Sequence, residues 1–196
     1  MTFYATIAIA AAALLTGWGI VVFNRLVRHR NLVAEAWSGI DVQLKRRRNL
    51  VPNLVECVKH YMQHERTVLE RVTALRAEGE RTGSLRETAD HENALTDQLK
   101  GLFALAEAYP DLKADRSFLT LQQQLVEIED HIQMARRYFN GAVRDYNIRA
   151  ESFPDLLVAR ALKFAPRDFF QIETATDRVA PRVALQDAVD ARNHHP

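Results

Sequence analysis

The sequence predicts an all-α protein, with an N-terminal transmembrane helix followed by an antiparallel bundle of long helices. Residues 3–23 of the 196-residue chain are almost entirely apolar. After them, apolar residues recur every three or four positions, the period of helices with one buried stripe. Seven glycines and six prolines are too few for a strand-rich fold. We expect an anchor over residues 1–24, a helical bundle over residues 25–165 and an irregular tail over residues 166–196.

The apolar run from Phe3 to Phe23 is long enough to cross a bilayer. As a helix it covers about 30 Å, the thickness of the hydrocarbon layer. A cleaved signal peptide would need basic residues before the run, and residues 1–6 contain none. Basic residues stay on the cytoplasmic side of a membrane, and Arg25, Arg28 and Arg30 follow the run. We therefore expect a single-pass anchor that stays attached, with the N-terminus outside and the bundle in the cytosol.

Positive charge is concentrated next to this anchor. Residues 25–48 carry seven basic and two acidic side chains, a net charge of +5. Because the net charge of the whole chain is +1, the rest of it carries −4. A nucleic-acid-binding protein would carry positive charge across a domain face, so the expected partner is a lipid bilayer and not nucleic acid. The single cysteine cannot form an intrachain disulfide, which permits a reducing compartment.

The first element after the anchor keeps its helical spacing from Val33 to Leu75. Pro52 interrupts it, and because proline removes a backbone donor we expect a kink or break near residues 48–50. The segment is then one long bent helix or two stacked helices. We expect Gly79 and Gly83 to end it.

The remaining helices are recognised by their ends. Ser84, with Glu87 three residues later, predicts a capping box that opens the next helix. A Tyr-Pro-Asp turn at residues 109–111 precedes a helix expected from about residue 114 to 150, which a Phe-Pro pair ends. Residues 156–164 predict a short amphipathic helix.

Small side chains fall on one face of the anchor, at Thr6, Ala10, Ala13 and Gly17. Helices in lipid approach one another closely through faces of this kind. We therefore expect the chain to form a homo-oligomer through its anchor.

His60 and His64 are four residues apart on the expected helix, with Glu56 and Glu65 nearby, a spacing that could hold a metal. The polar residues around them make an ordinary solvated helix face the favoured interpretation, so we expect no metal and no other cofactor. Cys57 lies beside the apolar stripe, where we expect a small buried hydrophobe and not a nucleophile.

A polar seam follows one stripe of the last long helix, at Glu129, Arg136, Asn140 and Asn147. On the first helix Asp41 and Lys45 have helical spacing too. Polar groups beside a core need partners, so we expect Asp41 and Glu129 to meet Arg136 or Lys45 across the bundle. Such networks usually fix helix register, which makes a structural role the favoured alternative to a ligand site.

Two blocks of sequence resemble the bacterial LemA family. The first is LVAEAWSGIDVQLKRRRNLVPNLV at residues 32–55. The second comprises YPDLKA at residues 109–114, RRYFN at residues 136–140, Val143, Tyr146-Asn147 and Phe153-Pro154. The resemblance implies a membrane helix followed by an antiparallel helical bundle in the bacterial cytoplasmic membrane. It implies no catalytic residues and no cofactor, and a related branch is associated with membrane organelle formation in magnetic bacteria.

The functional expectation is a non-enzymatic, membrane-anchored scaffold that assembles with itself and organises membrane or partner proteins. One alternative is a membrane-tethered adaptor or sensor that regulates a protease or a signalling system. Another is a metal-handling helical bundle. The sequence names no protein partner.

Overall fold

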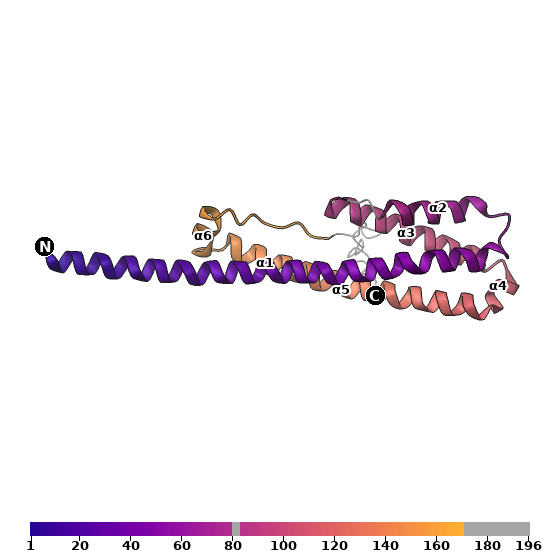
Figure 1. Ribbon diagram of the computed structural model, residues 1–196, viewed down its shortest axis with the longest axis horizontal. Coiled ribbons are helices and arrows are strands. Elements are labelled where there is room, and N and C mark those ends of the chain that lie inside the picture. The colour runs from indigo at the N-terminus through magenta and orange to yellow at the C-terminus, as the bar shows by residue number, and fades with distance from the viewer. Residues whose placement is uncertain (80–82, 171–196) are drawn as a thin grey trace, which may run out of the picture.

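The computed structural model describes residues 1–79 and 83–170, and every regular element in these ranges is a helix. The helices are α1 (Thr2–Lys59), α2 (Arg66–Glu78), α3 (Leu85–Ala106), α4 (Pro110–Ala114), α5 (Arg116–Glu151) and α6 (Asp155–Ala161). The N-terminal part of α1 projects alone from one end of an elongated bundle, and α2 and α3 lie toward the other end (Figure 1). The predicted all-α fold is confirmed.

The long helix α1 continues through Pro52 and ends at Lys59. The expected break near residues 48–50 is therefore absent, and the chain leaves the helix only between His60 and Glu65. Val51 and Leu54, on either side of the proline, are 1% and 0% exposed. Their packing keeps the helix in place, whereas proline itself costs only one backbone hydrogen bond and a local clash. Of the two expected forms, the structure has two helices, but they are divided at residues 60–65 and not near residues 48–50.

Local signals set the ends of α2, α3 and α5. Gly79 is the C-terminal cap of α2, as expected. The Ser84 hydroxyl accepts a hydrogen bond from the Glu87 N–H, and the Glu87 carboxylate accepts one from the Ser84 N–H, both at 3.2 Å. This confirms the capping box. The start of α5 is Arg116, not residue 114, because Asp115 caps it by accepting from the N–H groups of Ser117 and Phe118 at 2.7 and 3.0 Å.

The chain turns back after α5 through α6, which is shorter than the expected helix over residues 156–164. Lys163, at φ 57°, takes the left-handed conformation that ends the helix. Residues 164–170 then run without regular structure. The expected irregular tail begins at residue 166 within this stretch, and the rest of it lies outside the described residues.

The core runs along α1 as three clusters in sequence. The cluster farthest from the N-terminus includes Leu54, Val58, Val72, Leu102 and Phe118. The middle cluster includes Ile40, Leu44, Ile132, Phe139 and Tyr146. The cluster nearest the N-terminus consists of Val22, Leu26, Ala150 and Ala159. Burial of each large aliphatic side chain stabilises the fold by about 1.5–3 kcal/mol. Because the first buried residue of these clusters is Val22, packing in the bundle stabilises α1 from Val22 onward.

Candidate functional site

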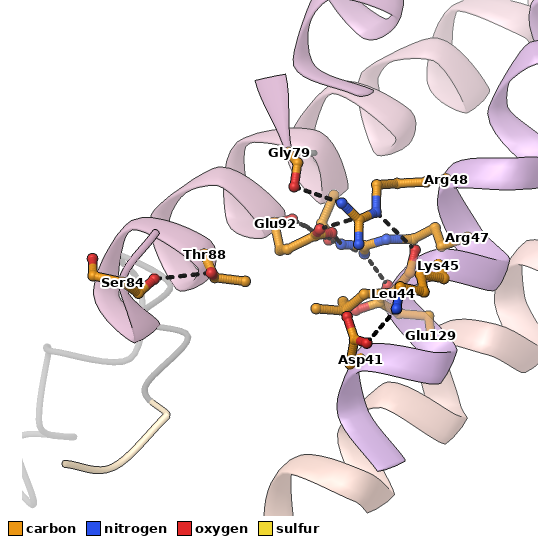
Figure 2. Close-up of polar contacts among 11 residues, drawn as sticks. Asp41, Leu44, Lys45, Arg47, Arg48, Gly79, Ser84, Thr88, Glu92 and Glu129 are labelled. Atoms are coloured by element: carbon orange, nitrogen blue, oxygen red, sulfur yellow. Dashed lines mark hydrogen bonds and ion pairs between the residues drawn. The ribbon is translucent and has the colours of Figure 1, made fainter. Parts of the chain in front are cut away.

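A buried ionic cluster joins α1, α3 and α5 (Figure 2). Arg47 of α1 is 2% exposed. Its guanidinium donates to the Glu129 carboxylate at 2.7 Å, to the Thr96 hydroxyl at 2.6 Å and to the Glu92 carbonyl at 3.1 Å. It also donates to the Glu92 carboxylate, which is 2% exposed on its side chain. One arginine on α1 thus holds an acid from each of two other helices.

The neighbouring Arg48 extends this cluster toward α2. Its guanidinium donates to the Gly79 carbonyl at 2.5 Å, and its Nε lies 4.0 Å from the Glu92 carboxylate. Gly79 caps α2, so this bond satisfies a carbonyl at the negative end of the helix dipole. Arg47 and Arg48 together tie α1 to each of the other three long bundle helices.

Arg47 and Glu92 were not among the site residues predicted from the sequence, although a signal for both exists. Arg47 lies three residues after Leu44 and four before Val51, so it occupies a position of the apolar stripe. Glu92 lies three residues after Ala89 and three before Leu95, both of them buried. A charged residue at a core position of two different helices predicts a buried ion pair. Both positions were left out of the prediction because only apolar residues were used to trace the buried stripes.

The predicted seam is only partly brought together. Asp41 and Lys45 pair with each other at 2.6 Å, one turn apart on α1, with side chains 38% and 65% exposed. Glu129 meets Arg47, so the expected pairing of Glu129 with Arg136 or Lys45 is wrong. Arg136, half-buried, instead donates to Gln133 one turn before it on α5. The reason is register: Arg47 points into the core opposite Glu129, and Lys45 points outward.

Asn140 and Asn147 hold the segment that follows α6. The Asn140 amide donates to the Phe170 carbonyl at 3.1 Å and accepts from the Phe170 N–H at 2.9 Å. Asn147 makes the same pair of bonds to Arg167, at 2.9 and 2.8 Å. Between them the Tyr146 hydroxyl donates to the Ala165 carbonyl at 2.9 Å. These residues of the seam bind the protein's own backbone, as two amide clamps.

A groove of about 930 Å³ lies beside the ionic cluster. Its lining includes Arg30, Trp37, Asp41, Lys45 and Arg167. Trp37 packs edge-on against Phe139 and Phe170, with ring centroids 5.6 and 5.4 Å apart. The groove therefore offers an aromatic wall with charges of both signs at its rim, which suits a protein segment better than a small uncharged molecule.

His60 and His64 do not share a helix, because α1 ends at Lys59 and both residues lie in the turn before α2. The helical spacing on which the metal interpretation rested is therefore absent. Cys57 is half-buried, with its sulfur 4.0 Å from the Asp115 carboxylate. Burial, and then the negative charge of Asp115, raise the pKa of the Cys57 thiol. A raised pKa keeps the thiol protonated and makes it a poor nucleophile.

Thr6, Ala10, Ala13 and Gly17 are exposed along the projecting part of α1, as is every residue from 1 to 17. Arg25, Arg28 and Arg30 are exposed at two, five and seven residues after the end of the apolar run at Phe23. Within the described residues, α1 is the helix that is long and apolar enough to cross a membrane.

The fold and the site define a class, namely a helical bundle with a long apolar N-terminal helix and a buried ionic cluster at its centre. The model of the LemA family matches residues 36–185. The chain therefore belongs to the LemA family.

Curated relatives agree with this assignment. Protein LemA of Metamycoplasma hominis is 26% identical over 149 residues, covering 76% of this chain and 68% of that protein. Magnetosome proteins MamQ 1 and MamQ 2 of Paramagnetospirillum magneticum are each 25% identical over 166 residues, covering 71% of this chain and 61% of theirs. The chain thus spans less than two thirds of the length of the two MamQ proteins. A membrane-associated helical protein is the description that the fold and these relatives support.

Proposed function

We propose that the protein is a non-enzymatic scaffold that is anchored in the bacterial cytoplasmic membrane and assembles through its anchor. The observation that carries this proposal is the apolar surface of α1 between residues 2 and 17, which the rest of the described chain leaves uncovered. A large apolar surface of this kind needs lipid or another copy of the chain around it. The small side chains on one of its faces suit close contact between copies.

The bundle supports a structural role more than a chemical one. The terminal nitrogens of the Arg47 guanidinium bond to the carboxylates of Glu92 and Glu129, and the amides of Asn140 and Asn147 bond to backbone. Two relatives are named as magnetosome proteins, which supports a role at a membrane structure. Arg25, Arg28 and Arg30 support a cytosolic position for the bundle.

The test replaces Ala13 and Gly17 together by Leu in the full chain. A Cβ at Gly17 would meet nothing within 4 Å, so the substitution leaves the single chain undisturbed. Leu keeps the helix apolar but holds neighbouring helices apart, so we expect smaller oligomers by native mass spectrometry in detergent.

The matched control is the Ala8→Leu, Ala11→Leu double variant, which adds almost the same bulk, less by one methylene, to the opposite face of the helix and should keep the parent mass. Equal masses for all three proteins would show that the anchor face has no part in assembly. The proposal of anchor-driven assembly would then be wrong.

The groove beside Trp37 favours a second candidate, an adaptor or sensor that holds a segment of a protease or signalling protein. A scaffold gives a defined oligomer in native mass measurements. An adaptor gives a monomer that carries a second protein in fixed ratio, and this difference separates the two candidates.

A further inference from the structure

The turn from α5 into α6 packs against the membrane end of α1 and not against the middle of the bundle. Ala159 of α6 and Ala150 of α5 are buried against Val22 and Leu26, with Trp18 packed on the same cluster. The rings of Phe23 and Phe164 lie 5.9 Å apart. Figure 1 shows α6 at the end of the bundle from which α1 projects. The bundle thus begins alongside residues that belong to the apolar run.

The length of the free part of the run places this contact at the membrane. Residues 3–17 lie clear of the bundle and are all exposed. As a helix they cover about 22 Å, which is short of the hydrocarbon thickness of about 30 Å. Residues 18–23 supply the remaining 9 Å or so, by the same rise per residue. Because α6 packs against this part of α1, it lies at the same depth relative to the membrane as residues 18–23.

The surface at this end has the composition of a membrane interface. Phe153, Leu157 and Leu162 are 80%, 56% and 52% exposed around α6. On α1, Ile20 and Val21 are 56% and 48% exposed at the same level. Arg160 and Lys163 are exposed beside them, and Arg25, Arg28 and Arg30 follow on α1. Apolar side chains bordered by cations are typical of segments that lie at the headgroup boundary of anionic lipid.

We infer that the α5–α6 turn is a second membrane contact, which sits in the headgroup and upper acyl region of the bilayer that α1 enters. Phe153, Leu157 and Leu162 insert, and Arg160 and Lys163 contact lipid phosphates. The expected depth of about 9 Å falls within the 5–10 Å at which interfacial helices lie. This inference rests on the proposed anchor. It adds that the bundle is held at the membrane surface at two places and not by one helix alone.

The test measures lipid contact at single positions of the full chain. With Cys57→Ala as the background, single cysteines are introduced by Leu157→Cys, Leu162→Cys, Ile9→Cys and Val126→Cys. Each is labelled with an environment-sensitive fluorophore and reconstituted into vesicles of phosphatidylethanolamine and phosphatidylglycerol. Lipids with a nitroxide at shallow or deep acyl positions then quench labels that touch the bilayer. All four native residues are at least half exposed, so labelling does not disturb the core.

The expected result is quenching by shallow nitroxides at positions 157 and 162, by deep nitroxides at position 9, and none at position 126. Quenching at position 9 alone would show an anchored protein without a second contact and would overturn the inference. An emission shift at positions 157 and 162 without quenching would mean that protein covers this surface, which also overturns it. Absence of quenching at position 9 would refute the anchor itself, and the inference with it.

Discussion

At the scale of the residue, Arg47 is a buried cation that bonds to acids of two other helices. Arg47 and Glu92 are each 2% exposed, so neither charge can be hydrated if its partner is lost. A buried ion pair adds little net stability over an apolar replacement, whereas removal of one partner leaves an uncompensated charge in the core. The cluster therefore acts mainly by requiring one arrangement of α1, α3 and α5.

Replacement of Arg47 by Met should lower the free energy of unfolding by about 3–5 kcal/mol, because Glu92 is then left with the longer contact to Arg48, at 4.0 Å, and Glu129 loses its bond to Arg47. Chemical unfolding of the full chain in detergent, followed by circular dichroism, measures the change. Arg46→Met is the matched control, since Arg46 is exposed on the same turn and its loss should cost no more than about 0.5 kcal/mol. Similar losses for the two variants would contradict a buried role for Arg47. Arg136→Met should resemble the control, because Arg136 is half-buried and bonds to Gln133 of its own helix.

Asp115 gives the protein a dependence on acid pH. Hydrogen bonds from the Phe118 N–H and then from the Tyr61 hydroxyl hold the pKa of this carboxyl below its usual 3.8. A carboxyl with a lowered pKa stabilises the fold fully above its unfolded pKa, and loses that contribution as the pH falls through its folded pKa. Asp115→Asn keeps a capping side chain but removes the charge. The unfolding midpoint of this variant should fall less steeply than that of the parent below about pH 4, by thermal melts at several pH values. Parallel curves would refute the assignment.

At the scale of the element, α1 and α5 each have a second role besides packing in the core. The helix α1 contains the apolar run, forms one side of the core and supplies Arg47 and Arg48 to the ionic cluster. Because it is one continuous helix, no hinge separates the apolar run from the bundle. In α5 the polar stripe faces the chain that returns after α6, and its amides replace the hydrogen bonds that this irregular backbone lacks.

Loss of one amide clamp should free that returning segment without unfolding the helices. Asn140→Ala removes two hydrogen bonds to Phe170, at a cost of about 1–3 kcal/mol. We expect faster hydrogen exchange at residues 165–170, with unchanged exchange in α5. Arg137→Ala, at an exposed position on the same turn, should leave both segments as in the parent. Exchange that rises equally along the whole chain would instead mean global destabilisation.

At the scale of the whole molecule, the continuity of α1 determines how the bundle stands. A helix without a break between residues 2 and 59 makes the bundle follow the direction of the anchor. The basic run at residues 45–48 then begins about 33 Å beyond Phe23 along the helix axis, well clear of the lipid headgroups. The uninterrupted helix therefore favours a bundle that stands upright on the membrane over one that lies flat on it.

The direction in which α1 crosses the membrane decides on which side the bundle lies. A fluorescent reporter that folds only in the cytosol should be active when fused after Pro196, because basic residues that follow an apolar run tend to stay on the cytoplasmic side. The anchor should remain attached, so N-terminal sequencing of purified protein should still find residues 1–6. A reporter active only outside the cytoplasm, or a mature chain that begins after residue 20, would contradict the prediction.

Local patterns in the sequence were sufficient for the fold class, the apolar run, the capping box at Ser84 and the end of α5. Each depends on residues within one or two turns, where helical period and cap chemistry act directly. Long-range contacts decided the rest. Arg47 meets Glu92 and Glu129 across 45 and 82 residues of chain, and Asn140 meets Phe170 across 30. Which groups become partners depends on the axial register of neighbouring helices, and only the packing of the assembled core sets that register. For the same reason α1 passes Pro52 without a break, and α6 comes to lie beside the apolar run.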